Sequence, residues 1–447
     1  MTRKEKIISL VIVLTLIITE CGLAYVTVEA VNEKNTPSAM QGQPPQQSSG
    51  NAQYSAQTEI TDDTTISNES YSSKTADENA VLVSGAEATL DNITVTKTGD
   101  SDGGDNTSFY GTNSGIIAKD GAKLTIKNST VTTNATGANG VFSYGGSATT
   151  DNASSDSTEV NISNSTIVTK KDNSGGIMTT GGGIMNATDL TVKTYGTSSA
   201  AIRSDRGGGT VNVNGGTYTT NGQGSPSVYS TADISVKNAK LVSNVSEGVV
   251  IEGKNSVNLE NCELNDNNTK LNGQSTTYKN IFLYQSMSGD ADTGTVSFTA
   301  KNCKITTQKG NTLYVTNTAA EINLENNTIS NTDSSGYFLR VQKDSWGNSD
   351  SNGGAVELNM KNQKAKGNVC VDSISTLTMS LSGGSYYEGA LNSENSAKEL
   401  SLKLDSSSKI KLTGDSYVST LDDEDTTYSN IDFNGYTLYV GSNALKG

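Results

Sequence analysis

A short phrase recurs in this chain and restricts the folds that are open to it. Residues 123–133 read KLTIKNSTVTT, and residues 159–169 read EVNISNSTIVT. Apolar and polar residues alternate within each copy, and a period of two is typical of a β-strand rather than of a helix. An Asn then stands where the backbone must bend before a second short strand begins. The phrase therefore predicts pairs of short strands joined by a tight turn.

Copies of the phrase share the pattern apolar-x-apolar-x-Asn-x-x-apolar. Their first apolar residues are Ala88, Leu124, Val160, Met185, Val211, Ile234, Val257, Phe298, Ile322, Leu358, Met379 and Ile431, with a degenerate copy near Leu402. A fixed core with unequal spacing predicts rungs of one length that carry loops of variable length. Leucine-rich repeat spacing is absent, and a β-sandwich gives successive copies no reason to agree. The expected fold is all-β: a parallel β-helix, a solenoid of about 13 coils.

Side chains that would stack between coils agree with one register. Adjacent strands lie about 4.8 Å apart, so neighbouring coils should carry compatible residues at equivalent positions. One such column alternates in charge: Lys237, Glu260, Lys301, Glu325 and Lys361. Another column runs Thr94, Thr130, Thr166, Thr191, Thr217, Lys240, Glu263 and Lys304. The Asn of each copy is expected to turn the chain, as Gly215 and Gly383 would at the same position.

The chain begins with segments that lack this repeat. Residues 1–30 carry three basic residues and then an apolar run, which is the pattern of an export signal. The run reaches Val28 if Glu20 is tolerated, so an uncleaved membrane anchor remains an alternative to a cleaved signal peptide. Residues 31–78 hold three of the four prolines and no apolar period, which predicts a disordered polar linker. The β-helix is expected to occupy residues 79–447.

Two features of composition exclude whole classes of function. The 447-residue chain has no histidine, which removes Ser-His-Asp and Cys-His catalysis and the HExxH zinc site. Its formal net charge of −15 argues against nucleic acid as a partner. Membrane contact is expected only through the N-terminal segment. Any catalysis would have to depend on carboxylates, Lys, Arg or Tyr.

The repeats from about residue 80 to residue 447 resemble those of right-handed parallel β-helix proteins of the pectin-lyase-like superfold. They are most similar to exported, adhesin-like β-helix proteins of Gram-positive bacteria. The resemblance implies a right-handed coil but little about activity, because the superfold hosts lyases, hydrolases, esterases and passive adhesins. Its hydrolases imply Asn-Thr-Asp, Asp-Asp, Gly-His-Gly and Arg-Ile-Lys motifs, which this sequence lacks. Its lyases imply calcium-binding carboxylates from successive coils beside an Arg or Lys base.

Three local patterns are candidate binding sites. In AAIRSDRGGG, Arg203, Asp205 and Arg206 adjoin a triple glycine, an arrangement suited to an acidic sugar; a solvated turn with a local ion pair is the alternative. In TGDSDGGDNTSFYG, clustered carboxylates suit calcium, with a solvated loop as the alternative. The loop aromatics suit stacking against sugar rings, although some of them could instead belong to the core. The carboxylates are Asp100, Asp102 and Asp105, and the aromatics are Tyr110, Tyr144 and Trp346.

Two further patterns leave alternatives open. Columns of Thr-x-Thr resemble the faces of ice-binding β-helices, but Val168 and Lys193 interrupt them, and Thr is in any case a good strand residue. Cys262 and Cys303 fall in one inward column of consecutive coils, within reach of a disulfide or stacked as buried thiols.

These observations favour an exported protein, secreted or tethered to the cell surface by its N-terminal segment. Its expected role is non-enzymatic contact with an extracellular glycan or with a host or cell-surface protein through variable loops. No cofactor is expected apart from calcium at the Asp100–Asp105 loop. The alternative is a calcium-assisted polysaccharide lyase with an Arg or Lys base, for which Arg203 and Arg340 are candidates.

Overall fold

The structure is a computed structural model that describes residues 52–101, 104–146, 155–273 and 275–447. The chain divides into two units, residues 1–46 and residues 47–447, and every described residue belongs to the second unit. The expected export signal and the expected linker up to residue 51 lie outside the described residues. Within the described part of the chain, no helix is both long enough and apolar enough to cross a membrane.

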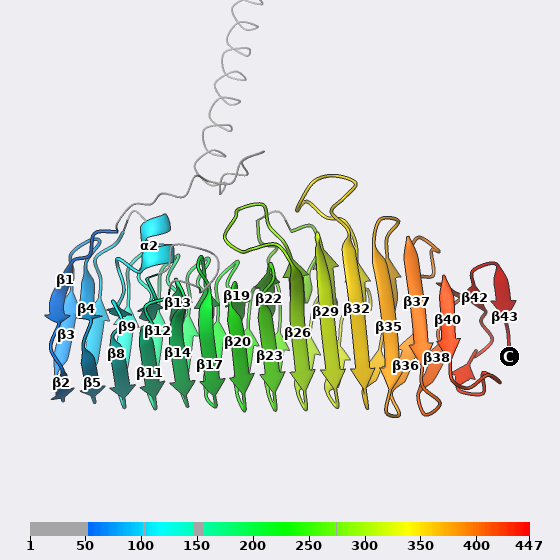
Figure 1. Ribbon diagram of the computed structural model, residues 1–447, viewed down its shortest axis with the longest axis horizontal. Coiled ribbons are helices and arrows are strands. Elements are labelled where there is room, and N and C mark those ends of the chain that lie inside the picture. The colour runs from blue at the N-terminus through cyan, green and yellow to red at the C-terminus, as the bar shows by residue number, and fades with distance from the viewer. Residues whose placement is uncertain (1–51, 102–103, 147–154, 274) are drawn as a thin grey trace, which may run out of the picture. The chain divides into compact units, whose positions relative to one another are not determined.

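Short strands wind into stacked coils, and each complete coil contributes one strand to each of three walls (Figure 1). Along the chain the strands enter sheet A, then sheet B, then sheet C, before the next coil begins. Within each sheet, neighbouring strands come from successive coils and pair in parallel, apart from the last strand of the chain, β43 (Asn443–Leu445), which pairs antiparallel with β42 (Leu438–Val440). The fold is a right-handed parallel β-helix, as predicted.

Sheets A and B are the two longest walls. Sheet A contains β1 (Ala56–Ile60), β4 (Asn79–Ser84), β7 (Ile116–Lys119), β10 (Val141–Tyr144), β13 (Ile177–Thr180), β16 (Ile202–Ser204), β19 (Val228–Ser230), β22 (Val249–Glu252), β25 (Lys279–Tyr284), β28 (Asn311–Thr316), β31 (Leu339–Val341) and β34 (Val369–Val371). Sheet B contains β2 (Thr64–Ser67), β5 (Glu87–Asp91), β8 (Lys123–Lys127), β11 (Glu159–Ser163), β14 (Gly183–Thr188), β17 (Gly209–Asn214), β20 (Asp233–Lys237), β23 (Ser256–Glu260), β26 (Thr295–Lys301), β29 (Thr318–Glu325), β32 (Gly354–Lys361), β35 (Thr376–Ser382), β37 (Glu399–Leu404) and β40 (Thr420–Asp423).

The third wall is sheet C, which sheet D continues toward the C-terminus. Sheet C contains β3 (Ser70–Ser73), β6 (Thr94–Lys97), β9 (Thr130–Thr133), β12 (Thr166–Thr169), β15 (Thr191–Thr194), β18 (Thr217–Thr220), β21 (Lys240–Ser243), β24 (Glu263–Asp266), β27 (Lys304–Thr307) and β30 (Thr328–Asn331). Sheet D contains β33 (Lys364–Lys366), β36 (Tyr386–Gly389), β38 (Lys409–Leu412) and β41 (Ile431–Asp432). A small sheet E, made of β39 (Ser416–Val418), β42 (Leu438–Val440) and the antiparallel β43, ends the chain. The short helix α2 (Asp105–Tyr110) lies between β6 and β7.

The register of sheet B is the one that the repeat predicts. From Ala88 to Met379, each first apolar residue pairs with its counterpart in the next coil, and Leu402 continues the ladder. The final copy was wrongly placed, because Ile431 pairs with Ile410 on the third wall, while Leu421 follows Leu402 in sheet B. The alternation in a strand of only two residues does not reveal which wall it joins.

The β-helix begins earlier than the sequence predicted. Strands β1, β2 and β3 form a complete first coil within residues 56–73, so the expected linker up to residue 78 is wrong for this part. Thr64 pairs with Ala88, and Ser70 pairs with Thr94. The first coil carries Thr at an inward position where later coils carry aliphatic residues, which weakens the apolar period in the sequence.

The predicted ladders hold the outer faces of sheets B and C together. The Thr column continues in register through Lys240, Glu263 and Lys304. Ion pairs join Lys237 to Glu260 at 2.9 Å and Lys301 to Glu325 at 3.3 Å. Inside the coils, aliphatic and aromatic side chains stack into one continuous core. Cys262 and Cys303 are free, buried thiols of this core, and the Cys262 amide donates to Cys303 Sγ at 3.4 Å.

Candidate functional site

Loop length distinguishes one face of the molecule from the others. Among the connections bounded by described strands, the five longest are 98–115, 145–158, 267–278, 285–294 and 342–353, and we call these the roof loops. Each of them either leads into sheet A from sheet C or leads out of sheet A toward sheet B. By contrast, the turns from sheet B to the third wall have two residues from β2 through β33 (Figure 1). Variable loops on a regular scaffold are where binding residues concentrate, so the sheet A face is the candidate site.

The outer side of sheet A carries an apolar and aromatic strip beneath the roof loops. Toward the N-terminus the strip consists of Leu82, Ile117, Phe142 and Met178, all buried. Toward the C-terminus it consists of Val250, Phe282, Tyr284 and Tyr314, also buried. A sheet facing water would carry polar residues at these positions, so the described parts of the roof loops cover this wall in place of solvent.

The structure brings Arg203, Asp205 and Arg206 together between the two apolar clusters. Arg203 Nη2 lies 2.6 Å from Asp205 Oδ2, and the Arg206 amide donates to Asp205 Oδ1 at 3.0 Å. Arg206 also pairs with Asp290 at 2.8 Å, and its guanidinium lies 4.0 Å from the centre of the Phe109 ring. Both guanidinium side chains are only 13 % exposed. Arg203 bonds within its own segment, to Asp205 and the Ser198 carbonyl, whereas Arg206 joins that segment to roof loop 285–294.

Glu252 is the centre of a second network that the sequence analysis missed. Its carboxylate accepts hydrogen bonds from Tyr229 Oη at 2.8 Å and Tyr284 Oη at 2.9 Å, and a third from Ser286 Oγ. Burial raises the pKa of Glu252 above its usual range, even though these hydroxyls partly offset the shift. The only signal in the sequence was an acidic residue that ends the otherwise apolar strand VVIE. Because Ser286 belongs to roof loop 285–294, Glu252 anchors that loop.

Asp205 shares this electrostatic environment. Burial raises the pKa of its carboxyl, and the Asp290 carboxylate acts in the same direction, against the opposing effect of Arg203. The two networks therefore place acidic groups close together under the roof loops. Asp205 and Glu252 are both buried, and each is hydrogen-bonded within the protein.

The predicted aromatic residues form two groups instead of one platform. Tyr110 and Tyr144 meet edge to face at 5.7 Å between ring centres, and Tyr54 lies 6.5 Å from Tyr144. Trp346 instead packs against Tyr284, at 4.8 Å between ring centres. Trp346 is half-buried, and its indole N–H has no hydrogen-bond partner among the described residues.

Roof loops from opposite edges of sheet A meet above its outer face. Thr276 Oγ1, in the loop leading into β25, donates to Asp344 Oδ1 at 2.9 Å in the loop that leaves β31. Tyr314 of sheet A donates to the other Asp344 oxygen at 2.6 Å. At the other end of the face, Thr180 Oγ1 donates to the Phe109 carbonyl at 2.6 Å. The outermost surface of this side is therefore made by the loops.

The predicted calcium loop uses one of its carboxylates in an ion pair. Both oxygens of Asp100 lie 2.9 Å from Lys171 Nζ, and Oδ1 accepts a hydrogen bond from the Thr136 amide at 2.7 Å. The hydrogen bond from Lys171 is the main reason that the pKa of Asp100 lies below its usual range. Asp102 and the side chain of Asp105 lie outside the described residues. No group of three or more Cys, Asp or Glu side chains in the described part of the chain could hold a metal ion.

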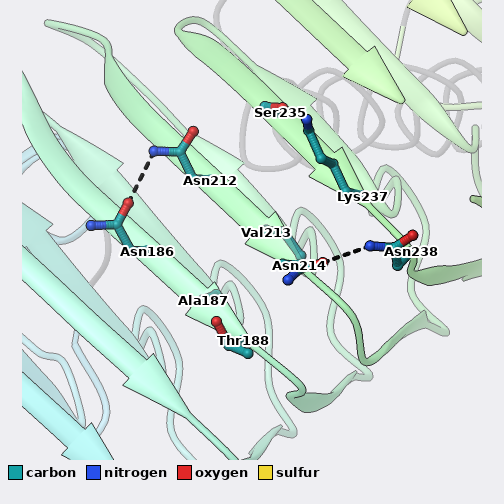
Figure 2. Close-up of a pocket in the computed structure, with 9 residues that line it drawn as sticks. All are labelled: Asn186, Ala187, Thr188, Asn212, Val213, Asn214, Ser235, Lys237 and Asn238. Atoms are coloured by element: carbon teal, nitrogen blue, oxygen red, sulfur yellow. Dashed lines mark hydrogen bonds between the residues drawn. The ribbon is translucent and has the colours of Figure 1, made fainter. Parts of the chain in front are cut away.

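Sheet B carries an open hollow of about 380 Å³ on its outer face (Figure 2). It is lined by Asn186, Ala187, Thr188, Asn212, Val213, Asn214, Ser235, Lys237 and Asn238. The amides in it are bonded from coil to coil: Asn212 Nδ2 donates to Asn186 Oδ1 at 2.9 Å, and Asn238 Nδ2 donates to Asn214 Oδ1 at 2.8 Å. Because these amides bond to one another and Lys237 is paired with Glu260 of the next coil, the hollow is part of the stacking ladder.

Comparison with known proteins finds no matching family model, no matching curated protein and no matching solved structure. The fold is thus shown by the parallel register of the three walls alone. The sheet A face, with its roof loops, is where the described coils carry their five longest connections.

Proposed function

We propose that this protein is an exported, non-enzymatic β-helix of the adhesin-like kind, which contacts neutral glycans at the cell surface through the roof loops. The observation that supports this proposal most strongly is the confinement of all five long loops to the two edges of sheet A. A stack of coils satisfies its own backbone, so the hydrogen bonds between coils do not require loops of this length. They are available for recognition.

The composition of the roof loops suits recognition of a hydroxyl-rich polymer. Residues 342–353 read QKDSWGNSDSNG, and residues 285–294 read QSMSGDADTG. Ser, Asn and Gly supply adaptable hydrogen bonds, while an aromatic residue such as Trp346 supplies a flat apolar surface for a sugar ring. The indole N–H of Trp346 is itself buried, so a sugar would meet the exposed part of the ring rather than this nitrogen. The net charge of −15 favours a neutral glycan over an acidic one.

The titratable groups under the roof loops favour binding over catalysis. A general acid or base must reach its substrate, but Glu252 is 1 % exposed and Asp205 is 5 % exposed. Of the arginines that could serve a lyase as base, Arg203 is paired with Asp205 and Arg206 with Asp290, while Arg340 donates from Nε to Gln342 Oε1 at 2.6 Å. The lyase alternative would require these pairs to separate when substrate binds.

The test is a glycan-array screen of the full chain, together with an ultraviolet assay for unsaturated product on neutral and acidic polysaccharides. We expect binding without product. Trp346→Ala should weaken binding about threefold to tenfold, the range of a single aromatic contact, whereas Trp346→Phe should keep most of it. Tyr428→Ala is the matched control, since Tyr428 is 36 % exposed and lies far from the roof loops, in the connection between β40 and β41. Formation of unsaturated product would contradict the proposal.

A further inference from the structure

A column of buried polar side chains runs along the corner between sheets C and A. Its members are the last residues of successive sheet C strands, paired in register: Thr133, Thr169, Thr194, Thr220, Ser243, Asp266 and Thr307. Several of the hydroxyls donate to backbone carbonyls of the corner that follows. Thr133 Oγ1 lies 2.7 Å from the Ala138 carbonyl, and Ser243 Oγ lies 2.9 Å from the Ser246 carbonyl. Hydroxyl and carbonyl oxygen atoms therefore line this corner.

Asp266 interrupts this column with a carboxylate. Its side chain is 0 % exposed, and neither of its oxygens has a hydrogen-bond partner among the described residues. An unpaired carboxylate in the interior is costly unless a proton or a cation neutralises it. Burial raises the pKa of Asp266, and the nearby Glu247 raises it further, while the backbone N–H of Asn268 acts in the opposite direction.

The nearest buried lysine does not neutralise Asp266. Lys279 Nζ donates to Ser275 Oγ at 2.9 Å and to the Thr277 carbonyl at 3.2 Å. It also lies 4.3 Å from the centre of the Phe282 ring, on the outer side of sheet A. No ion pair joins Lys279 to Asp266 in the described part of the chain.

Two amide oxygens at the same corner also lack partners. Asn268 Oδ1 and Asn280 Oδ1 are buried and unbonded within the described residues. Asn268 Nδ2 donates to the Lys279 carbonyl at 2.6 Å, and Asn280 Nδ2 donates to Thr307 Oγ1 at 3.0 Å and to the Thr306 carbonyl at 3.4 Å. Because a carbonyl can only accept, these bonds fix which end of each amide is the oxygen. Thr307 is the ladder neighbour of Asp266, so the unpaired oxygens share one corner.

We propose that the corner at Asp266 is an internal calcium site, with the Asp266 carboxylate and the amide oxygens of Asn268 and Asn280 as ligands. Calcium prefers hard oxygen ligands and accepts carboxylate, amide and backbone oxygens in irregular geometry. The site needs only one carboxylate ligand, and the negative charge of Glu247 nearby adds to the attraction. It is separate from the Asp100 loop. A bound ion here would fix the entry of roof loop 267–278, which begins directly after Asp266.

The experiment compares the full chain after removal of metal by chelation and after addition of CaCl₂, NaCl or MgCl₂. Metal content is measured by mass spectrometry, and stability is measured as Tm. We expect one calcium site per chain and a rise in Tm of at least about 3 °C with calcium. Asp266→Thr, which restores the residue of the neighbouring positions, should fold and lose this response. Asn268→Ala, a loop change that removes one oxygen ligand, should weaken calcium affinity several-fold.

Two variants test the location of the site. Glu357→Gln removes one negative charge from an exposed position of sheet B and should keep the calcium response. Asp100→Asn should keep it as well. The proposal is overturned if the unaltered chain holds no calcium and shows no shift, since Asp266 is then protonated and donates as Thr does at the equivalent positions. It is also overturned if Asp266→Thr retains the full shift, or if sodium but not calcium produces it.

Discussion

The connections at the two edges of sheet B differ in length and in regularity. Where sheet B meets the third wall, two residues suffice in coil after coil, and the first of them has positive φ: 53° at Asn92, 54° at Asn238 and 54° at Asn326. On the side where sheet A meets sheet B, the connections range from a single residue after β28 to the long loops 145–158 and 342–353.

The tight turns are constrained by contacts between coils, whereas the roof loops are free of that constraint and, in our proposal, serve recognition. In the tight turns the Asn side chains bond to one another, as Asn326 Nδ2 does to Asn302 Oδ1 at 2.8 Å, so each turn restricts the next. The roof loops instead bond to remote partners, such as Arg206 to Asp290, and no loop repeats another. A change in a roof loop should therefore leave the hydrogen bonds between coils in place.

The largest expected effect comes from lengthening a tight turn. A Gly-Ser insertion after Asn238 breaks the match with the two-residue turns of both neighbouring coils and should lower Tm by more than about 5 °C. The same insertion after Gly289, in roof loop 285–294, should lower it by less than about 2 °C, because loop closure entropy changes slowly with length. Thermal unfolding of the two variants measures the difference. Equal losses of Tm in the two variants would contradict the distinction between constrained tight turns and tolerant roof loops.

Packing gives the next largest contrast. Phe298 is fully buried in the core behind sheet B, so Phe298→Ala should lower the free energy of unfolding by about 3–5 kcal/mol. Met287 is 59 % exposed in roof loop 285–294, and Met287→Ala should change it by less than about 0.5 kcal/mol. Urea unfolding monitored by circular dichroism provides both values. A large loss at Met287 would mean that the roof loop is part of the core.

The Asn of a tight turn contributes to stability in two ways, which two variants can separate. Asn238→Ala loses both the side-chain ladder and the tolerance of positive φ, and it should cost about 1–2 kcal/mol of unfolding free energy. Asn238→Gly keeps the backbone conformation, as Gly215 does with φ of 78° in the preceding coil, and should cost less. If both variants lose the same amount, the ladder rather than the backbone conformation dominates.

The stability of the protein should depend on pH through Glu252, the last residue of β22, which holds roof loop 285–294 through Ser286. The folded-state pKa of Glu252 is raised above its ordinary value of 4.5, so the folded protein binds this proton more tightly than the unfolded chain does. The free energy of unfolding should therefore fall as pH rises above 4.5. Glu252→Gln should flatten this slope and change stability at neutral pH by about 1 kcal/mol. Unfolding titrations between pH 4.5 and pH 8 test the sign, and an unchanged slope would exclude Glu252 as its source.

The charge ladder on sheet B should contribute least. Lys301 is 45 % exposed and pairs with Glu325 at 3.3 Å. Lys301→Gln should cost no more than about 0.5 kcal/mol, and that cost should disappear at high salt, where exposed charges are screened. Unfolding measured at low and high salt reveals this dependence.

Much of the fold could be predicted because stacking forces equivalent positions to carry compatible residues. The columns through Leu124 and Thr130 predict the register from the sequence alone. The first coil was missed because Thr64 stands where later coils have aliphatic residues, and Ile431 was misplaced because its strand has only two residues.

The candidate site was less predictable, for a physical reason. Arg203 and Asp205 are close in sequence, and their pairing could be anticipated. The contacts of Arg206 with Asp290, and of Glu252 with Tyr229 and Tyr284, depend on how separate loops fold over sheet A. Such contacts leave no periodic trace in the sequence.

Hydrogen exchange of the full chain, with and without the best ligand from the glycan array, tests most directly the claim that the roof loops are the contact surface. The account predicts slower exchange in residues 267–278, 285–294 and 342–353, with no change in the tight turns at Asn92, Asn128 or Asn238. Protection that is confined to the outer face of sheet B or to those turns would contradict it.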